Sequence, residues 1–226
     1  MCAPVTHSHP TPLATRSAGP LSGQLKVPGD KSISHRALML GAVATGRTLI
    51  RGLLESEDVI NTAHAVTALG APARKAGDLW EVLGRGTGGL SQPERPLEFG
   101  NSGTGTRLMM GLIAPHDISV SMTGDASLSK RPMGRVLGPL KRMGLEVDGD
   151  AERLPLTIRG TSRLTPISYE LPVPSAQLKS AILLAGLGTA GETTVVEREA
   201  TRDHTERMLR HFGAEVVTIA DNGATR

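Results

Sequence analysis

The stretch KSISHRALMLGAVATGRTLIRGLLESEDVINTAHAVTALGAPA, residues 31–73, shows an order of elements that recurs twice more along the chain. It begins with a small-residue turn, continues through an apolar helical run and a β-rich stretch, and ends in a second amphipathic helix before Gly70. Residues 101–147 and 175–216 repeat this order, and their second helices end before Gly144 and Gly213. Glycine adopts the left-handed conformation that commonly ends a helix. The period of about 70 residues predicts three similar units.

A short β-rich segment follows the second helix of each unit, at residues 80–83, 156–158 and 216–219. Each unit is therefore predicted as strand, helix, strand, helix, strand, although helix–strand alternation also occurs by chance. We expect an α/β fold in which the three units form one lobe around a pseudo-threefold axis, with parallel helices inside and sheets outside. The lobe is expected over residues 23–226, after a flexible tail at residues 1–22.

Composition narrows the class of protein and of ligand. The formal net charge of +3 mildly favours anionic partners, but aromatic residues make up only 2% of the chain. Proteins that bind single-stranded RNA need aromatic side chains for base stacking, so small phosphorylated metabolites suit this chain better than nucleic acid. No apolar run approaches the roughly 20 residues that span a bilayer. The single cysteine, Cys2, offers no disulfide framework or thiolate metal site, and the residues before Gly19 lack a secretory signal, which favours a cytoplasmic location.

Each unit places a cation four residues after a small or hydroxyl residue near the start of its first helix. The pairs are Ser32 with Arg36, Gly103 with Arg107, and Ser175 with Lys179. Residues four apart share a helix face, and helix N-termini attract anions. If the units pack around an axis, these three helix ends are predicted to form one positive face.

Four segments are candidates for anion binding. In residues 25–36 a strand is predicted to end at Pro28-Gly29, so that Lys31, Ser32 and Arg36 could converge on a phosphate. The glycine-rich loop at residues 99–107 could cradle an anion with backbone N–H groups, but it lacks the spacing of a Walker A loop. Residues 122–133 and 173–180 supply further cations, hydroxyls and an amide. A capped helix or an ordinary charged loop explains each segment equally well when it is considered alone, and His204 suits an exposed helix-start residue as well as a base.

Taken together, the motifs LKVPGDKSISHRALML, GNSGTGTRLMMGL, GDASLSKRPMGRV, SAQLKSAILLAGL and TRDHTERMLRHFGA resemble the 5-enolpyruvylshikimate-3-phosphate synthase family. The resemblance extends from Gly23 almost to the end of the chain. It implies the enolpyruvyl transferase fold and a reaction in which the 5-hydroxyl of shikimate 3-phosphate attacks C2 of phosphoenolpyruvate. Phosphate is then released, and neither a metal nor an organic cofactor is needed. Such a site must hold two phosphates and a carboxylate with preorganised positive charge.

The resemblance also implies roles for individual residues. Lys31 would be catalytic and would contact both substrates. The residues expected to bind shikimate 3-phosphate are Lys31, Ser32, Arg36, Ser175, Ala176, Gln177 and Arg202. Those expected to bind phosphoenolpyruvate are Lys31, Gly103, Thr104, Arg131 and Gln177, with Asn101 beside them.

Two departures from the family pattern shape further expectations. The chain resembles a bacterial branch of the family that includes glyphosate-tolerant enzymes. Those tolerant enzymes carry alanine where this chain has Gly103, so we expect glyphosate to inhibit the complete enzyme. Family members are also nearly twice as long, and their second domain brings the acidic residues that handle protons. The 226-residue chain alone is therefore expected to bind shikimate 3-phosphate weakly and to turn nothing over, whereas the full-length enzyme is expected to be monomeric.

Two other functions remain possible at this stage. The enolpyruvyl transferase of cell-wall synthesis, which uses a UDP-sugar, shares the fold and the donor substrate. It typically has a cysteine in its first half and Lys-Asn where this chain has Lys31-Ser32. A non-catalytic anion-binding or RNA-binding module of related architecture is the second alternative, and the scarcity of aromatic residues counts against it.

Overall fold

The first repeated unit forms a helical layer against a three-stranded antiparallel sheet. The computed structural model describes residues 13–17, 19–149, 152–221 and 224–225, so Cys2 lies outside the described residues. The elements of this unit are α1 (Lys31–Val43), β1 (Thr45–Arg51), α2 (Glu57–Ala68), β2 (Ala73–Ala76) and β3 (Leu79–Arg85). The sheet has the order β1-β3-β2, so the last strand of the unit lies in its centre.

The second unit repeats this arrangement and adds a parallel edge strand. Its elements are β4 (Leu97–Glu98), α3 (Gly103–Ile113), β5 (Ser119–Thr123), the 3-10 helix η1 (Leu128–Lys130), α4 (Gly134–Met143), β6 (Glu146–Gly149) and β7 (Leu156–Arg159). The sheet order is β4-β5-β7-β6, in which β4 is parallel to β5 and the other pairs are antiparallel.

The third unit has the same element order, but its strands form two separate pairs. Its elements are β8 (Ser168–Glu170), α5 (Ala176–Gly186), β9 (Thr194–Val196), α6 (His204–His211), β10 (Ala220–Asp221) and β11 (Ala224–Thr225). β8 pairs with β9 in parallel, and β10 pairs with β11 as an antiparallel hairpin. The predicted fold class and the three-unit pattern are therefore confirmed.

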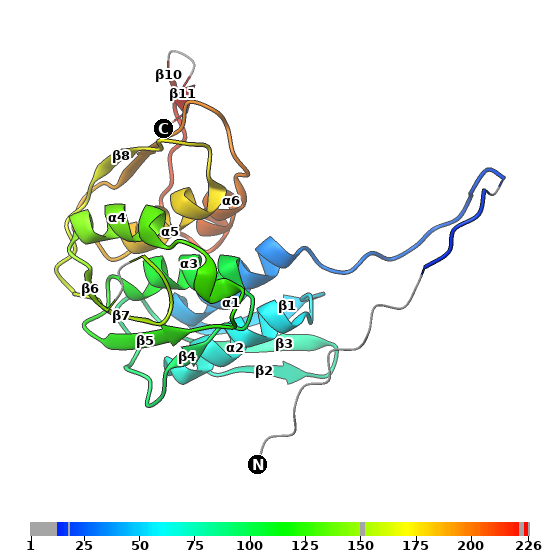
Figure 1. Ribbon diagram of the computed structural model, residues 1–226, viewed down its shortest axis with the longest axis horizontal. Coiled ribbons are helices and arrows are strands. Elements are labelled where there is room, and N and C mark those ends of the chain that lie inside the picture. The colour runs from blue at the N-terminus through cyan, green and yellow to red at the C-terminus, as the bar shows by residue number, and fades with distance from the viewer. Residues whose placement is uncertain (1–12, 18, 150–151, 222–223, 226) are drawn as a thin grey trace.

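The first helix of each unit lies in the interior. Figure 1 shows α1, α3 and α5 between the sheets of the first two units and the strands of the third. Residues 34–43 of α1 are all buried, as is almost all of α3, because both helices are apolar or small on nearly every face. At Gly111 the backbones of α3 and α5 come so close that an added Cβ would lie 2.2 Å from the carbonyl oxygen of Ala181.

Glycine ends the second helix of every unit, as the sequence predicts. Gly70, Gly144 and Gly213 follow the ends of α2, α4 and α6 with φ angles of 90°, 116° and 89°. This left-handed backbone conformation is sterically easy only for glycine. Each glycine turns the chain out of its helix towards the β-rich segment that follows.

Two predicted strands are wrong. Residues 19–30 contain no strand or helix and form an arm that leads away from the lobe (Figure 1). Leu25 and Val27 on this arm are 82% and 70% exposed, because no described strand lies beside them to pair with. Residues 216–219 are also outside any strand, although the segments at residues 80–83 and 156–158 are part of β3 and β7.

Within the described residues, none of the helices combines the length and the apolar character needed to cross a membrane.

Candidate active site

The first helices of the three units begin with side-chain caps that leave backbone N–H groups for a ligand. Asp30 caps α1 by accepting a hydrogen bond from the N–H of Ile33 at 2.8 Å. Ser102 and Ser175 cap α3 and α5 in the same way, at 3.1 Å and 3.3 Å from their partner nitrogens. A cap satisfies only one of the first few N–H groups, and the helix dipole makes this end positive.

Gln177 and Arg107 join the beginnings of α3 and α5. The amide nitrogen of Gln177 donates to the Thr104 hydroxyl at 2.9 Å, and Arg107 Nη1 donates to Gln177 Oε1 at 3.1 Å. Arg107 Nη2 also donates to the carbonyl of Pro132 at 3.1 Å. The glycine-rich loop, α5 and the segment after η1 are therefore tied together by one guanidinium group.

Arg131 reaches the same place from the segment after η1. Its Nη2 donates to Oδ1 of Asn101 at 2.5 Å, and Asn101 in turn donates to Asp125 at 2.8 Å. A Cβ atom at Gly103 would lie 3.0 Å from Arg107 Nη1 and 3.1 Å from Arg131 Nη1, so both guanidinium groups flank this glycine. We call Asn101, Gly103, Thr104, Arg107, Arg131 and Gln177 the arginine cluster.

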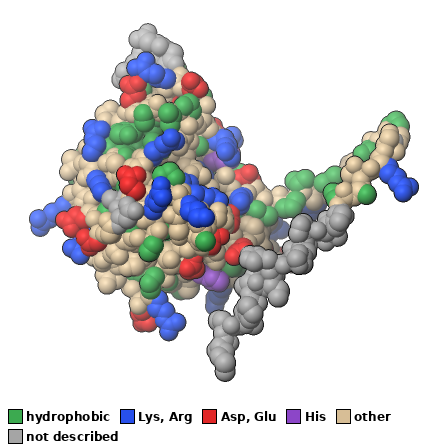
Figure 2. Space-filling model, in the orientation of Figure 1, with side chains coloured by type: hydrophobic (Ala, Val, Ile, Leu, Met, Phe, Trp, Pro, Cys, Tyr) green, Lys and Arg blue, Asp and Glu red, His purple; other side chains and the backbone are tan. Residues whose placement is uncertain are grey.

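The positive charges of the arginine cluster are close enough to influence each other. The pKa of Arg107 lies below its usual value, first because of burial and then because of the charges of Arg131 and Arg135. The hydrogen bonds that Arg107 and Arg131 donate go to carbonyl, amide and hydroxyl oxygens. Lys and Arg side chains gather over the inner helices in Figure 2. An anion is the ligand that this arrangement favours.

Lys31 lies at the first position of α1 and is half-exposed. Its Nζ forms an ion pair with Asp58 of α2 at 2.9 Å, a partner that the sequence motifs do not reveal. Ser32 is partly buried, and its carbonyl accepts a hydrogen bond from Arg36 at 2.9 Å. Arg202 is exposed just before α6, with no ion pair to another described residue, and its charge contributes to the lowered pKa of Arg36.

Arg36 points into the lobe, where its guanidinium group joins three helices, α1, α5 and α6. It is 3% exposed and donates to the hydroxyls of Ser180 and Thr205, each at 2.6 Å, as well as to Ser32. Burial is the main reason why the pKa of Arg36 falls to about 10. These three hydrogen bonds use three of the five guanidinium N–H donors. Two N–H groups therefore remain that could donate to the oxygens of a phosphate.

Lys179, the third cation of the predicted positive face, is also buried. Its Nζ lies 2.7 Å from Glu197 and 2.6 Å from Glu206, and these carboxylates neutralise its charge. The prediction that all three cations share one positive face is therefore wrong. Arg36 and Lys179 contact neighbouring elements inside the lobe and hold it together, and of the three cations only Arg107 lies in the arginine cluster.

The sequence analysis does not identify several residues that contact the candidate site. Arg107 was paired with Gly103 but not placed among the binding residues, although its position in GTGTR contained that signal. Asp58 and Asp125 approach the site only through tertiary packing. A cavity of about 1000 Å³ lies elsewhere, between β9 and residues 214–219. The described residues contain no group of three or more His, Cys, Asp or Glu side chains that could hold a metal ion.

The chain is similar to a family of known proteins. The model of the family "EPSP synthase (3-phosphoshikimate 1-carboxyvinyltransferase)" matches residues 15–225. A 3-phosphoshikimate 1-carboxyvinyltransferase of Paramagnetospirillum magneticum is 61% identical over 215 residues, which are 94% of this chain and 48% of the relative. One from a Bradyrhizobium species is 57% identical and covers 98% of this chain and 50% of its own length.

A solved structure shows the same fold. EPSP synthase from Acinetobacter baumannii superposes with a TM-score of 0.82 and 45% identity, over 90% of this chain and 46% of that structure. The chain therefore spans about half the length of the relatives that it matches. Because the family model matches nearly all of the chain and the fold agrees, this protein belongs to the EPSP synthase family.

Proposed function

We propose that this chain forms one lobe of an enzyme that transfers the enolpyruvyl group of phosphoenolpyruvate to the 5-hydroxyl of shikimate 3-phosphate. The lobe comprises residues 23–226 and follows a tail at residues 1–22. The hydroxyl gives up its proton as its oxygen forms a bond to C2 of phosphoenolpyruvate, and C3 gains a proton. The C2–O bond to phosphate then breaks, and C3 loses a proton to restore the double bond. The observation that carries the proposal is the arginine cluster, in which the guanidinium groups of Arg107 and Arg131 flank Gly103 and bond to carbonyl, amide and hydroxyl oxygens.

The arginine cluster suits the phosphoenolpyruvate end of this reaction. Gly103 leaves room between Arg107 and Arg131, and Thr104 and Gln177 offer neutral hydrogen-bonding groups beside them. Lys31 would add a mobile positive charge from α1, at the cost of loosening its exposed pair with Asp58. Positive groups that are already in position stabilise the charge that develops on the phosphate and carboxylate during transfer.

The beginnings of α1, α5 and α6 suit shikimate 3-phosphate. Ser175, Ala176 and Gln177 form the start of α5, and Arg202 precedes α6. Ser32 and Arg36 connect these two places through the Ser180 and Thr205 hydroxyls. We propose that Arg36 contributes its two remaining N–H donors from beneath the ligand while it fixes the relative position of the three helices.

Further proposals follow from the same assignment. Glyphosate is expected to compete for the phosphoenolpyruvate end, the full-length enzyme is expected to be monomeric, and its location is expected to be the cytoplasm. The reaction requires no metal or organic cofactor. Size-exclusion chromatography with light scattering and subcellular fractionation would test the assembly state and the location.

A two-part assay tests the function. Calorimetry with the 226-residue chain should show weak binding of shikimate 3-phosphate, and the chain alone should release no phosphate from the substrate pair. Adding the C-terminal half of the Paramagnetospirillum magneticum relative should restore phosphate release that depends on both substrates. The Arg131→Ala variant should abolish this release, whereas Lys130→Ala, which removes the neighbouring exposed cation, should retain it.

The possible results separate the alternatives. Transfer to a UDP-sugar instead of shikimate 3-phosphate would favour the cell-wall enzyme. Equal loss in both cation variants would mean that net charge matters and the arginine cluster does not. Absence of any response to shikimate 3-phosphate in the binding and turnover assays would overturn the proposal.

A further inference from the structure

Helix α6 has little apolar packing, so polar contacts decide where it lies in the lobe. Of its eight residues, only Thr205 and Leu209 are buried, and only one of these two is apolar. The position of α6 matters because Arg202, which the proposed function assigns to shikimate 3-phosphate, lies directly before its start. The contacts that hold α6 therefore also decide where the charge of Arg202 lies.

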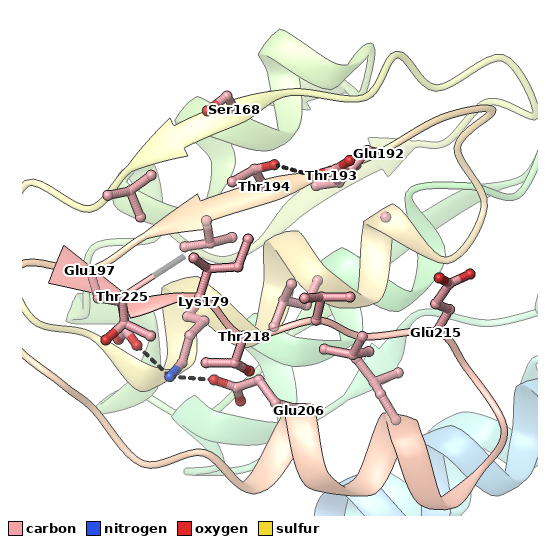
Figure 3. A pocket seen from close by; sticks show the side chains of 18 of the residues that line it. Ser168, Lys179, Glu192, Thr193, Thr194, Glu197, Glu206, Glu215, Thr218 and Thr225 are labelled. Carbon is pink, nitrogen blue, oxygen red and sulfur yellow. Dashed lines mark hydrogen bonds and ion pairs between the residues drawn. The ribbon is translucent and has the colours of Figure 1, made fainter. Parts of the chain in front are cut away.

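Two buried polar contacts join α6 to α5. The hydroxyl of Thr205 lies 2.6 Å from the hydroxyl of Ser180, and both residues are closed to solvent. The carboxylate of Glu206 lies 2.6 Å from Nζ of Lys179. Figure 3 shows this lysine between Glu206 and Glu197. Because water does not reach these groups, it cannot replace either contact when the helices move.

Arg36 connects the two hydroxyl groups to α1. It donates from Nε to Thr205 and from Nη2 to Ser180, each at 2.6 Å. Its Nη1 donates to the carbonyl of Ser32 at 2.9 Å. The hydroxyl of Ser180 lies 2.6 Å from the carbonyl oxygen of Ala176, the first residue of α5. The three helices α1, α5 and α6 therefore meet at one guanidinium group and two hydroxyl groups.

Only one assignment of the two hydroxyl protons gives each of them an acceptor in these contacts. A guanidinium N–H can only donate and a carbonyl can only accept, whereas a hydroxyl has one proton to donate. The proton of Thr205 can go only to Ser180, because its other contact here is with a donor. Ser180 must then donate its own proton to Ala176. The hydrogen bonds thus run in one direction, from Arg36 through the two hydroxyls to the start of α5.

We propose that Thr205 is a positioning residue for the binding of shikimate 3-phosphate, an inference that rests on the proposed function. Its hydroxyl holds Nε of Arg36 and so fixes the plane of the guanidinium group, whose two remaining N–H groups are assigned to the ligand. The same hydroxyl fixes the start of α6, and with it Arg202, against α5. Thr205 is 1% exposed, so it acts on the ligand through these neighbours.

The two cations that Thr205 positions act on each other through space. Burial is the main cause of the lowered pKa of Arg36, and the charge of Arg202 lowers it further. Charge-assisted hydrogen bonds to a phosphate depend on the direction of each N–H group, so both cations must be held in place. Thr205→Val keeps the shape of the side chain but leaves Nε of Arg36 without an acceptor where water does not reach.

NMR of the 226-residue chain tests the hydrogen bonds without any ligand. The Nε–H resonance of Arg36 should exchange slowly with water in the wild type, because a buried and hydrogen-bonded group exchanges only through local opening. Thr205→Val should make this exchange faster, whereas Thr205→Ser, which restores a hydroxyl, should keep it slow. The side-chain amide of Gln177, which donates to Thr104, should keep its resonance in both variants and so report an intact arginine cluster.

Titration of the same chain with shikimate 3-phosphate tests the positioning role. Thr205→Val should weaken binding by about tenfold, since a lost hydrogen bond to a charged group has about this effect on affinity. Thr205→Ser should recover most of the affinity. Thr62→Val is the matched control, because it removes an equally buried hydroxyl that contacts His35 at 2.7 Å instead of Arg36, and it should leave the affinity unchanged.

The outcomes separate this role from the proposed function. If the wild type does not respond to shikimate 3-phosphate, the proposed function fails and the positioning role fails with it. If the wild type binds and Thr205→Val binds equally well, the proposed function stands and the positioning role is refuted. Equal weakening in Thr62→Val would also refute it, because the loss would then follow from removing any buried hydroxyl. So would a Thr205→Ser variant that binds no better than Thr205→Val.

Discussion

Replacing Gly111 by alanine should separate the two inner helices that carry the arginine cluster. The added Cβ would lie 2.2 Å from the carbonyl oxygen of Ala181 and 2.7 Å from its carbonyl carbon. Both atoms belong to the backbone of α5, so no change of side-chain rotamer can relieve the contact. Ordinary van der Waals contact begins at 3.4 Å. The helices must therefore move apart by about 1 Å, which a close-packed interior resists.

The expected loss of stability follows from two opposing effects. Alanine favours the helix over glycine by about 1 kcal/mol. Overpacking costs typically about 1–3 kcal/mol and occasionally more, and a clash with backbone belongs at or above the upper end. We expect a net destabilisation of about 2 kcal/mol, which lowers the melting temperature of a chain of this size by about 4–8 °C.

The same movement should weaken ligand binding, because the hydrogen bonds from Gln177 to Thr104 and from Arg107 to Gln177 cross from one helix to the other at 2.9 and 3.1 Å. A shift of about 1 Å puts both beyond normal hydrogen-bond length. Calorimetry with shikimate 3-phosphate, at a temperature where the variant is folded, should show this loss separately from the loss of stability.

Gly138→Ala provides the matched control. This glycine is also helical, but an added Cβ would meet nothing within 4 Å. The helical gain from alanine is offset by the following Pro139, which disfavours a helical residue before it, so the change should stay within about 0.5 kcal/mol. If Gly111→Ala melts with the wild type, the close approach of α3 and α5 is wrong and the reasoning fails.

Three other substitutions test separate features. Lys179→Met should destabilise the chain by about 3–5 kcal/mol in urea titrations, since it leaves the carboxylates of Glu197 and Glu206 buried without a cation, and adding Glu197→Gln and Glu206→Gln should recover part of the loss. Burial lowers the pKa of His35 from 6.5 to about 4, so the unfolded state binds the proton more readily and stability should fall by about 3 kcal/mol as pH drops from 6.5 to 4. His35→Gln should flatten this part of the pH profile, and an unchanged slope would assign it to other groups. Gly103→Ala places a methyl group about 3 Å from two guanidinium groups, and in the reconstituted enzyme it should reduce inhibition by glyphosate more than it reduces use of phosphoenolpyruvate; equal glyphosate sensitivity in both proteins would reject this account.

The repeated order of elements could be predicted because each signal is local. An apolar helical run, a β-rich stretch and a terminal glycine lie close together in sequence, and Gly70, Gly144 and Gly213 all have the expected positive φ angle. The two segments that were wrongly predicted as strands have the residue types of a strand, but no described strand pairs with them. Residues 25–27 and 216–219 show that β-propensity does not form a strand unless another strand supplies its hydrogen bonds.

The candidate site could be predicted less completely. The family resemblance implied that Gly103, Arg131 and Gln177 belong together, and the contacts through Arg107 unite them. Helix spacing alone could not distinguish an inward cation from an outward one. Arg36 and Arg107 each follow a small or hydroxyl residue by four positions, yet the first is buried and the second faces the glycine-rich loop.

The depth of each cation explains which of them remain available to a ligand. Lys179 is buried, and the carboxylates of Glu197 and Glu206 neutralise its charge inside the lobe, so this charge does not attract a ligand. Arg107 and Arg131 are bonded mainly to carbonyl, amide and hydroxyl oxygens, which satisfy their N–H groups but leave their charges in place. Burial is the main cause of the lowered pKa of Arg107, and repulsion by the charges of Arg131 and Arg135 lowers it further. An anion between Arg107 and Arg131 relieves that repulsion and forms charge-assisted hydrogen bonds, so the unbalanced charge favours a phosphorylated ligand over a neutral one of equal size.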